Sequence, residues 1–239
     1  MKYLARLLVL IGLLPLPAYA GQVTVAVAAN FLPVAEEIAS DFTEATGHEV
    51  VLSHGSTGQI YAQIENGAPF DIFLAADDLR PARLAESGRA IRRQSYAFGR
   101  LVLVSRDPVT AETVAEAVAG KVVALADPLV APYGLASTAA MERLRLDTAT
   151  FQPVLVANVG QVATVFRTRN ASFAFVAASL LPKLGDASVF ELDGLYPKIR
   201  QDAAFLARAE GDEAAEAFWS YLFSEPAQAA IAASGFDRP

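Results

Sequence analysis

The sequence contains no cysteine and only two histidines, His48 and His54. The absence of cysteine excludes disulfides, thiolate catalysis, iron–sulfur clusters and cysteine zinc sites, and two histidines are too few for a histidine-rich metal site. Basic residues are also in the minority, because 19 lysines and arginines face 26 acidic residues and the formal net charge is -7. No basic footprint for a nucleic acid follows from such a balance. With 239 residues, 54% of them apolar, the chain is still able to bury a sizeable core.

The first twenty residues have the pattern of a secretory signal peptide. Lys2 and Arg6 precede an apolar run from Leu7 to Leu16, and Ala18 and Ala20 are small residues at the positions that a signal peptidase reads. We therefore predict cleavage after Ala20 and a periplasmic location. No later stretch reaches the roughly 18 uninterrupted apolar residues of a membrane helix. The sequence thus predicts a protein that is exported and released.

Short β-rich runs alternate with helical stretches along the rest of the chain. Val23, Val25 and Val27 alternate with other residues in the first predicted strand. Further strands are predicted over 49–53, 71–75, 101–105, 121–126, 153–157, 173–177 and 188–192, and helices over 31–46, 59–66, 79–87, 134–146, 161–169, 213–223 and 226–235. This alternation is typical of an α/β protein with open, mostly parallel sheets flanked by helices.

Two extended connections, at 96–101 and 191–200, divide this pattern into two α/β halves. We predict a discontinuous first lobe made of residues 21–98 plus 194–239, and a continuous second lobe made of residues 99–193. Two crossings between lobes form a hinge, so a ligand cleft is expected between them.

Four turns between a predicted strand and the following helix are candidates for the ligand-binding groups of this cleft. In open α/β sheets, ligands lie beyond the carboxyl ends of strands, where the following helices present free backbone N–H groups and the positive end of their dipoles. The turns carry glycine or short polar side chains and are 28–31 (Ala-Ala-Asn-Phe), 54–58 (His-Gly-Ser-Thr-Gly), 131–134 (Ala-Pro-Tyr-Gly) and 158–160 (Asn-Val-Gly). They suit a small anion.

Each of these residues also has an ordinary structural interpretation. Asn30 and Thr57 are standard helix N-cap residues, Ser56 fits a turn, and Tyr133 fits a half-buried ring with its hydroxyl in water. Their joint placement is what favours a binding site. Asp77 and Asp78 follow a strand and precede a helix, so we expect them to cap that helix rather than hold a metal.

These turns and their neighbours, in this order, resemble the periplasmic molybdate-binding proteins of molybdate ABC transporters. The resemblance is carried by 28–31, 55–58 with 61–64, 66–73 with 76–77, 127–128, 131–134, 157–161 and Gly235-Phe236. The asparagine at 30 and the tyrosine at 133 are most similar to a branch known from nitrogen-fixing bacteria. The resemblance implies a two-lobed periplasmic-binding-protein fold with the ligand between the lobes.

The resemblance also implies which residues bind the anion. Asn30 matches a serine or asparagine that donates from backbone and side chain, and Thr57 matches a serine hydroxyl donor. Tyr133 matches a position that gives a backbone N–H and a phenolic hydroxyl, and Val159 one that gives a backbone N–H. Ala29 and Ser56 complete the predicted site, although Ala29 stands where the branch can place a threonine hydroxyl. Ala177 likewise stands where members place a tyrosine.

The function implied is capture of molybdate, and of tungstate, for transient delivery to a membrane ABC permease, by a monomer that catalyses no reaction. No cofactor is expected, and molybdenum enters only as the bound oxyanion, through the residues already named. A tetrahedral dianion without a proton needs donors only, so neutral N–H and O–H groups suffice. Protonated phosphate would leave a donor unpaired, whereas sulfate differs from molybdate only in size.

Two alternatives stay open from the sequence. One is a receptor for another tetrahedral oxyanion such as sulfate. The other is an exported enzyme with an unrecognised site: His54 beside Ser56 suggests a nucleophile, but the G-x-S-x-G elbow is missing because residue 54 is not glycine. Neither a phosphate loop nor a dinucleotide fingerprint is present in the sequence.

Overall fold

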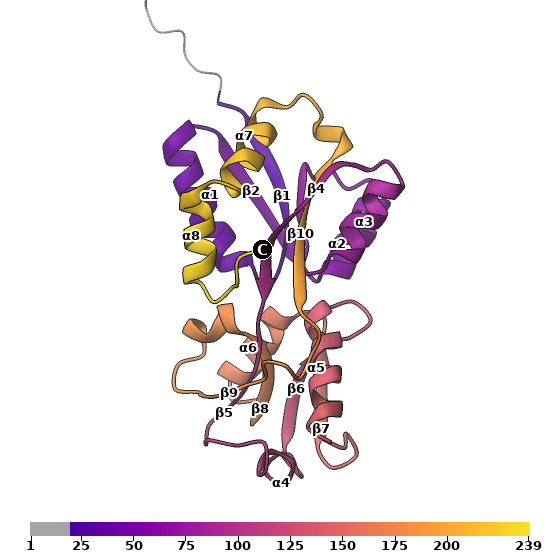
Figure 1. Cartoon of the computed structure of the whole chain (residues 1–239), viewed down its shortest axis with the longest axis vertical. Helices are drawn as coiled ribbons and strands as arrows, with labels where there is room; N and C mark the ends of the chain where they lie inside the picture. The colour runs from indigo at the N-terminus through magenta and orange to yellow at the C-terminus, as the bar shows by residue number, and fades with distance from the viewer. Residues whose placement is uncertain (1–19) are drawn as a thin grey trace, which may run out of the picture.

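The computed structural model describes residues 20–239 and consists of two lobes, each built on its own five-stranded sheet (Figure 1). Of the predicted signal peptide, residues 1–19 lie outside the described residues, and only its last residue, Ala20, is described. Within 20–239, no helix has both the length and the apolar character that crossing a membrane requires. The two-lobed α/β fold expected from the sequence is confirmed.

The first lobe contains the sheet with strand order β2-β1-β3-β10-β4. Its strands are β1 (Gln22–Ala28), β2 (Glu49–Gly55), β3 (Ile72–Leu74), β4 (Ala90–Gly99) and β10 (Ile199–Leu206). Its helices are α1 (Leu32–Thr46), α2 (Thr57–Glu65), α3 (Leu79–Glu86), α7 (Glu213–Leu222) and α8 (Glu225–Ala233), with a 3-10 turn η2 (Ala207–Ala209).

The second lobe contains the sheet with strand order β7-β6-β8-β5-β9. Its strands are β5 (Leu101–Ser105), β6 (Val122–Ala126), β7 (Gln152–Val156), β8 (Phe173–Ala177) and β9 (Ser188–Glu191). Its helices are α4 (Val114–Val118), α5 (Pro132–Arg143) and α6 (Val159–Arg167), and a 3-10 helix η1 (Ala178–Lys183) follows β8. The two lobes therefore share one topology.

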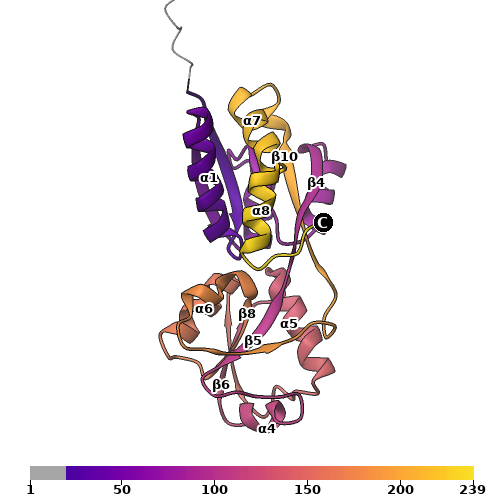
Figure 2. The ribbon, with the colours of Figure 1, turned by 60° about the vertical axis from the view of Figure 1, so that its left-hand side comes forward.

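In each sheet, four strands run in one direction and a single strand runs against them. In the first sheet the opposed strand is β10, which is antiparallel to β3 and β4. In the second it is β5, which is antiparallel to β8 and β9. Both opposed strands begin just after the chain has crossed between lobes, once from β4 to β5 and once from β9 to β10 (Figure 2). The crossings occur at the two connections marked in the sequence.

Two strands that border these connections were not predicted from the sequence. Residues 90–99 and 199–206 form β4 and β10, which pair with each other, whereas most of 191–200 connects the lobes outside regular strands. The sequence hid them because Arg92, Arg93 and Gln94 interrupt the apolar pattern of β4, while β10 contains the exposed Arg200 and the buried polar residues Gln201 and Asp202. Polar residues inside a strand weaken the periodicity by which strands are recognised.

Alternation along β1 explains how the first lobe is layered. Val23, Val25 and Val27 are buried in a cluster with residues of α1, α7 and α8 on one face of the sheet. Ala26 points the other way, into a cluster with residues of α2 and α3. The sheet is thus covered on both faces, and its strands can be apolar throughout. The second lobe has its own core, with α5 and α6 packed against its sheet.

Candidate functional site

A small cavity lies between the lobes, at the carboxyl ends of strands from both sheets. The cavity is tight in this arrangement, with a free volume of ≈ 10 Å³, which is room for about one water molecule. Its walls bring together the four turns that the sequence marked, and include all six predicted site residues. The lining residues are Ala28, Ala29, Asn30, Gly55, Ser56, Thr57, Ala76, Ala131, Pro132, Tyr133, Asn158 and Val159.

Three helix N-termini converge on this cavity. Helices α2, α5 and α6 begin at Thr57, Pro132 and Val159, each two residues before the predicted start. The earlier starts place the backbone N–H groups of Thr57, Tyr133 and Val159 in first turns, where no carbonyl of the same helix is available to them. These N–H groups, together with the positive ends of the three dipoles, suit an anion.

Ser56 and Thr57 form the hydroxyl-bearing part of the first lobe's wall. Ser56 is the N-cap of α2, and its Oγ accepts from the backbone N–H of Gln59 at 3.2 Å in a capping box. The Thr57 Oγ1 accepts from the buried N–H of Ala76 at 3.1 Å. Because each hydroxyl is here an acceptor, its own proton remains available for a ligand oxygen.

Asn30 is placed differently from the prediction. Its Nδ2 donates to the Oε1 of Gln201 at 3.0 Å and to the hydroxyl of Tyr133 at 3.4 Å, so both amide protons have protein acceptors. The expected side-chain donation to an anion is therefore not available in this arrangement. The Asn30 carbonyl accepts from the Ser179 Oγ at 2.8 Å. What Asn30 offers the cavity is its backbone N–H.

Ala29 contributes shape rather than a donor. Its backbone N–H is bonded to the carbonyl of Gly55 at 3.0 Å. Its methyl group faces Gly160 of the other lobe, where an added Cβ would come within 3.4 Å of it. The missing threonine hydroxyl is therefore not replaced at this position. Ala177 is fully buried as the last residue of β8 and does not line the cavity.

Behind the cavity lies a buried polar cluster that the sequence did not reveal. Gln201, on β10, accepts from Asn30 at 3.0 Å, and its Nε2 donates to the hydroxyl of Tyr133 at 3.4 Å. The Tyr96 hydroxyl lies 3.0 Å from both the Gln201 Oε1 and the Ala75 carbonyl. Burial raises the pKa of both Tyr96 and Tyr133 above the ordinary value of 10.0, so both phenols stay protonated at neutral pH. Gly99 makes room for this cluster, since a Cβ there would collide with Tyr133 and Gln201.

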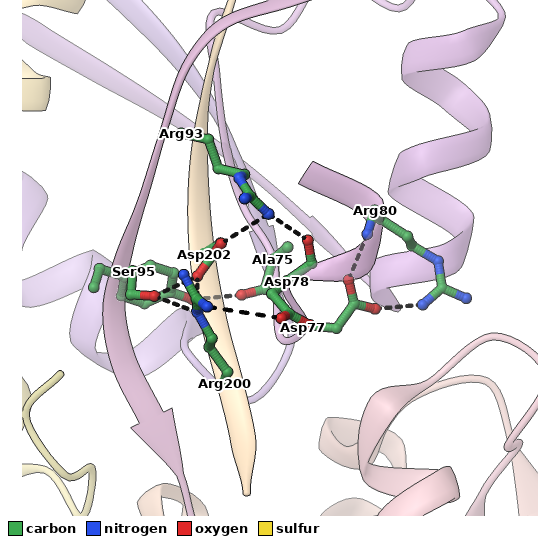
Figure 3. Close-up of polar contacts among 9 residues, drawn as sticks. Ala75, Asp77, Asp78, Arg80, Arg93, Ser95, Arg200 and Asp202 are labelled. Carbon is green, nitrogen blue, oxygen red and sulfur yellow. Dashed lines mark hydrogen bonds and ion pairs between the residues drawn. The ribbon is translucent and has the colours of Figure 1, made fainter. Parts of the chain in front are cut away.

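Among residues 20–239, no charged side chain lines the cavity. The nearest ionic network lies beside it, where β3, β4 and β10 meet (Figure 3). The fully buried Asp202 accepts from the Ser95 Oγ at 2.6 Å and from the Arg200 Nε at 3.0 Å, with Arg93 at 3.5 Å from its other oxygen. These contacts fix β10 against β4 next to Gln201.

The two aspartates after β3 lie beside arginine side chains. Asp77 Oδ1 accepts from the N–H of Arg80 at 2.9 Å, a capping contact as expected, and its other oxygen pairs with the Arg80 guanidinium. Asp78, the N-cap residue of α3, makes no side-chain capping hydrogen bond. Burial raises the pKa of Asp77 above 3.8. Within residues 20–239, no cluster of three His, Cys, Asp or Glu side chains could hold a metal ion.

The nucleophile interpretation of His54 and Ser56 is not supported by their placement. Ser56 faces the small cavity and is engaged in the capping box. His54 lines a neighbouring groove of ≈ 580 Å³, along with Arg167 and Lys183; the groove shares Ala29 and Asn158 with the cavity but does not include Ser56. The two side chains open on different spaces, so they do not form a nucleophile and base pair.

Hydrogen bonds join the lobes around the cavity. The backbone N–H of Gly58 donates to the carbonyl of Val130 at 2.9 Å. The Ser179 to Asn30 bond and the contacts of Tyr133 with Asn30 and Gln201 also cross from one lobe to the other. The structure is therefore a closed arrangement, in which a ligand in the cavity would be enclosed by both halves.

Comparison with known proteins adds a family and relatives. The family model described as bacterial extracellular solute-binding protein matches residues 23–237. Molybdate-binding protein ModA of Azotobacter vinelandii is 40% identical over 245 residues, covering 98% of this chain and 97% of that protein. Molybdate-binding protein ModA of Rhodobacter capsulatus is 40% identical over 239 residues, covering 97% of this chain and 94% of that protein.

The fold is also that of a solved relative. The structure of the periplasmic molybdate-binding protein of Azotobacter vinelandii superposes with a TM-score of 0.82 at 34% sequence identity, and covers 91% of this chain and 99% of that one. These similarities extend over both lobes and all four turns that surround the cavity.

Proposed function

The chain belongs to the bacterial extracellular solute-binding proteins, and within them to the molybdate-binding proteins; on this premise we propose that it encloses molybdate between its lobes and delivers it to an ABC permease. We extend the proposal to tungstate, a proton-free tetrahedral dianion of the same shape. The ligands proposed are Asn30, Ser56, Thr57, Tyr133 and Val159, with Ala29 contributing to the wall.

The observation that carries this proposal is the character of the cavity wall. Three helix N-termini and two hydroxyl groups surround a small closed cavity, and no charged side chain of the described residues 20–239 lines it. Such a wall provides hydrogen-bond donors without a counter-charge. Each hydrogen bond to a charged group contributes about 1.5–3 kcal/mol, so a handful of them can outweigh the dehydration of a dianion.

The same wall accounts for selectivity against protonated anions. A P–OH group of phosphate needs an acceptor, and no carboxylate lines the cavity. The proton of bound hydrogen phosphate would therefore point at a hydrogen-bond donor of the wall, and this unpaired contact costs about 1–3 kcal/mol. Sulfate carries no such proton, so only the size of the closed cavity separates it from molybdate.

The remaining parts of the proposal follow from the family. Solute-binding proteins of this kind act outside the cytoplasm, and we propose that the leader ends after Ala20 and that the released chain works as a monomer. We also propose that it holds no resident cofactor and catalyses no reaction, molybdenum being present only as the bound oxyanion. The permease contact is then transient, since the ligand must be given up.

A panel of anions tests the proposal. Thermal unfolding of the purified mature chain would be recorded with molybdate, tungstate, sulfate, phosphate and chromate. A ligand at ~1,000 times its Kd stabilises the fold by about 4 kcal/mol, and we expect this with molybdate and tungstate. A shift with sulfate alone would replace the assignment by a sulfate receptor. No shift with any of the five would reopen the question of an enzyme.

A further inference from the structure

Gln201 touches both halves of the cavity without lining it. It lies on β10, is fully buried, and contacts Asn30 of the first lobe and Tyr133 of the second. A buried amide is costly unless its donors and acceptors are paired. Here its Oε1 accepts from Asn30 and its Nε2 donates to Tyr133, while the single proton of the Tyr96 hydroxyl is shared between this Oε1 and the Ala75 carbonyl, each at 3.0 Å. The glutamine is therefore a fixed part of the wall behind the site.

The hydrogen bonds at Tyr133 determine what its hydroxyl can do. The phenolic oxygen faces two nitrogen donors, Asn30 Nδ2 and Gln201 Nε2, each at 3.4 Å. Amide nitrogens cannot accept a proton, so the hydroxyl proton of Tyr133 has to be donated to a third group. Tyr133 lines the cavity, and a ligand oxygen there can be that group.

We propose that Gln201 is a positioning residue for anion specificity: with Asn30 it fills the acceptor sites of the Tyr133 hydroxyl, so that this hydroxyl can only donate to the ligand. The inference rests on the proposed function and gives its selectivity a specific origin. A free tyrosine hydroxyl could turn and accept a proton from hydrogen phosphate. When Gln201 and Asn30 occupy its acceptor sites, the Tyr133 hydroxyl cannot accept that proton. The P–OH group of hydrogen phosphate then faces a hydrogen-bond donor.

Two surrounding features keep this arrangement in place. Asp202, the next residue along β10, is held by Ser95, Arg93 and Arg200 from the neighbouring strand and from β10 itself (Figure 3). Gly99 leaves the space that the Tyr133 hydroxyl and the Gln201 amide occupy. The contacts of Asp202 on β10 and the space left by Gly99 at the end of β4 thus both help to keep the Gln201 and Tyr133 side chains in place.

The test compares Gln201→Met, which keeps a similar volume without the amide, with wild type. Calorimetric titration at pH 7 would give the Kd of molybdate, and competition with up to 100 mM phosphate that of phosphate. We expect molybdate to bind about tenfold more weakly and the preference for molybdate over phosphate to shrink at least tenfold. Gln94→Met, at an exposed position on β4, is the matched control and should change neither value.

A double-mutant cycle separates positioning from a general loss of structure. Tyr133→Phe removes the hydroxyl, so Gln201→Met should have no further effect on the preference in that background. An additive effect, or an unchanged preference in folded Gln201→Met, would overturn the inference. If wild type itself fails to bind molybdate, the proposed function is lost instead, so the two failures are distinguishable.

A second variant covers the case in which Gln201→Met does not fold. Gln201→Glu has nearly the same shape, and its carboxylate would accept the Tyr133 proton and repel a dianion. Burial raises the pKa of such a carboxyl. We expect molybdate binding by Gln201→Glu to strengthen at least tenfold from pH 8.5 to pH 6, while wild type stays flat. A flat profile for both proteins would count against the role of Gln201.

Discussion

The backbone N–H of Gly58, at the start of α2, donates to the carbonyl of Val130 in the opposite lobe at 2.9 Å. The two segments come so close that a Cβ on residue 58 would lie 2.8 Å from the Val130 oxygen and 3.0 Å from the Arg80 guanidinium. Real Cβ atoms do not tolerate such contacts with backbone atoms. The glycine therefore permits the closed form, while the fold of either lobe does not require it.

We predict that Gly58→Ala weakens molybdate binding by about 10–100-fold, since overpacking costs on the order of 1–3 kcal/mol and here falls on the closed form. The free energy of unfolding without ligand should stay the same or rise slightly, because alanine is the better helix former. Titration calorimetry and denaturation measure the two quantities. Gly160→Ala, whose Cβ meets Asn158 at 3.2 Å and Ala29 at 3.4 Å, should show a smaller loss of affinity.

Thr57 has a structural role as well as a proposed binding role, and two substitutions separate them. Thr57→Val removes the acceptor of the buried Ala76 N–H, so we expect about 1–3 kcal/mol less stability together with weaker molybdate binding. Thr57→Ser keeps the hydroxyl and should retain most of both. Chemical denaturation and calorimetry of the pair would decide. Equal binding by Thr57→Val and wild type would remove Thr57 from the ligand set.

The sequence was sufficient to predict the fold and the four turns. Glycine and short polar residues after apolar strands mark helix N-termini, and the family resemblance placed Asn30, Thr57, Tyr133 and Val159 within one site. The structure arranges all of them around one cavity. Local pattern was enough here because each turn is specified by its own residues.

The residues that the sequence missed depend on contacts between distant segments. Gln201 and Ser179 carry no local signal, since one lies inside a buried strand and the other in a 3-10 helix. Their partners are 171 and 149 residues away in the chain. The side-chain hydrogen bonds of Asn30 in this structure were not predictable for the same reason, because they depend on Gln201. Only the pairing of β10 with β3 and β4 brings these groups together.

Ser179 provides a second test of lobe closure. Its hydroxyl donates to the Asn30 carbonyl across the cleft at 2.8 Å. Ser179→Ala would leave this carbonyl unpaired in the closed form, whereas water can reach it when the lobes separate. We predict a threefold to tenfold loss of molybdate affinity, as expected for a bond worth about 0.5–1.5 kcal/mol, with little change in ligand-free stability. A stability loss without any change in affinity would show that the bond supports the fold instead.

Asp77 gives a pH-dependent prediction whose sign follows from burial. Burial raises its pKa in the folded chain above 3.8, so the folded state holds this proton more tightly than the unfolded state does. The contribution of Asp77 to stability is therefore most favourable below about pH 3.8, and declines as the pH rises through the raised pKa. Asp77→Asn removes this proton and keeps an oxygen that can accept from the Arg80 N–H. The difference in unfolding free energy, wild type minus Asp77→Asn, should fall between pH 3.5 and pH 7 in urea denaturation. A difference that rises with pH would mean that the Arg80 ion pair, rather than burial, determines the charge of this carboxyl.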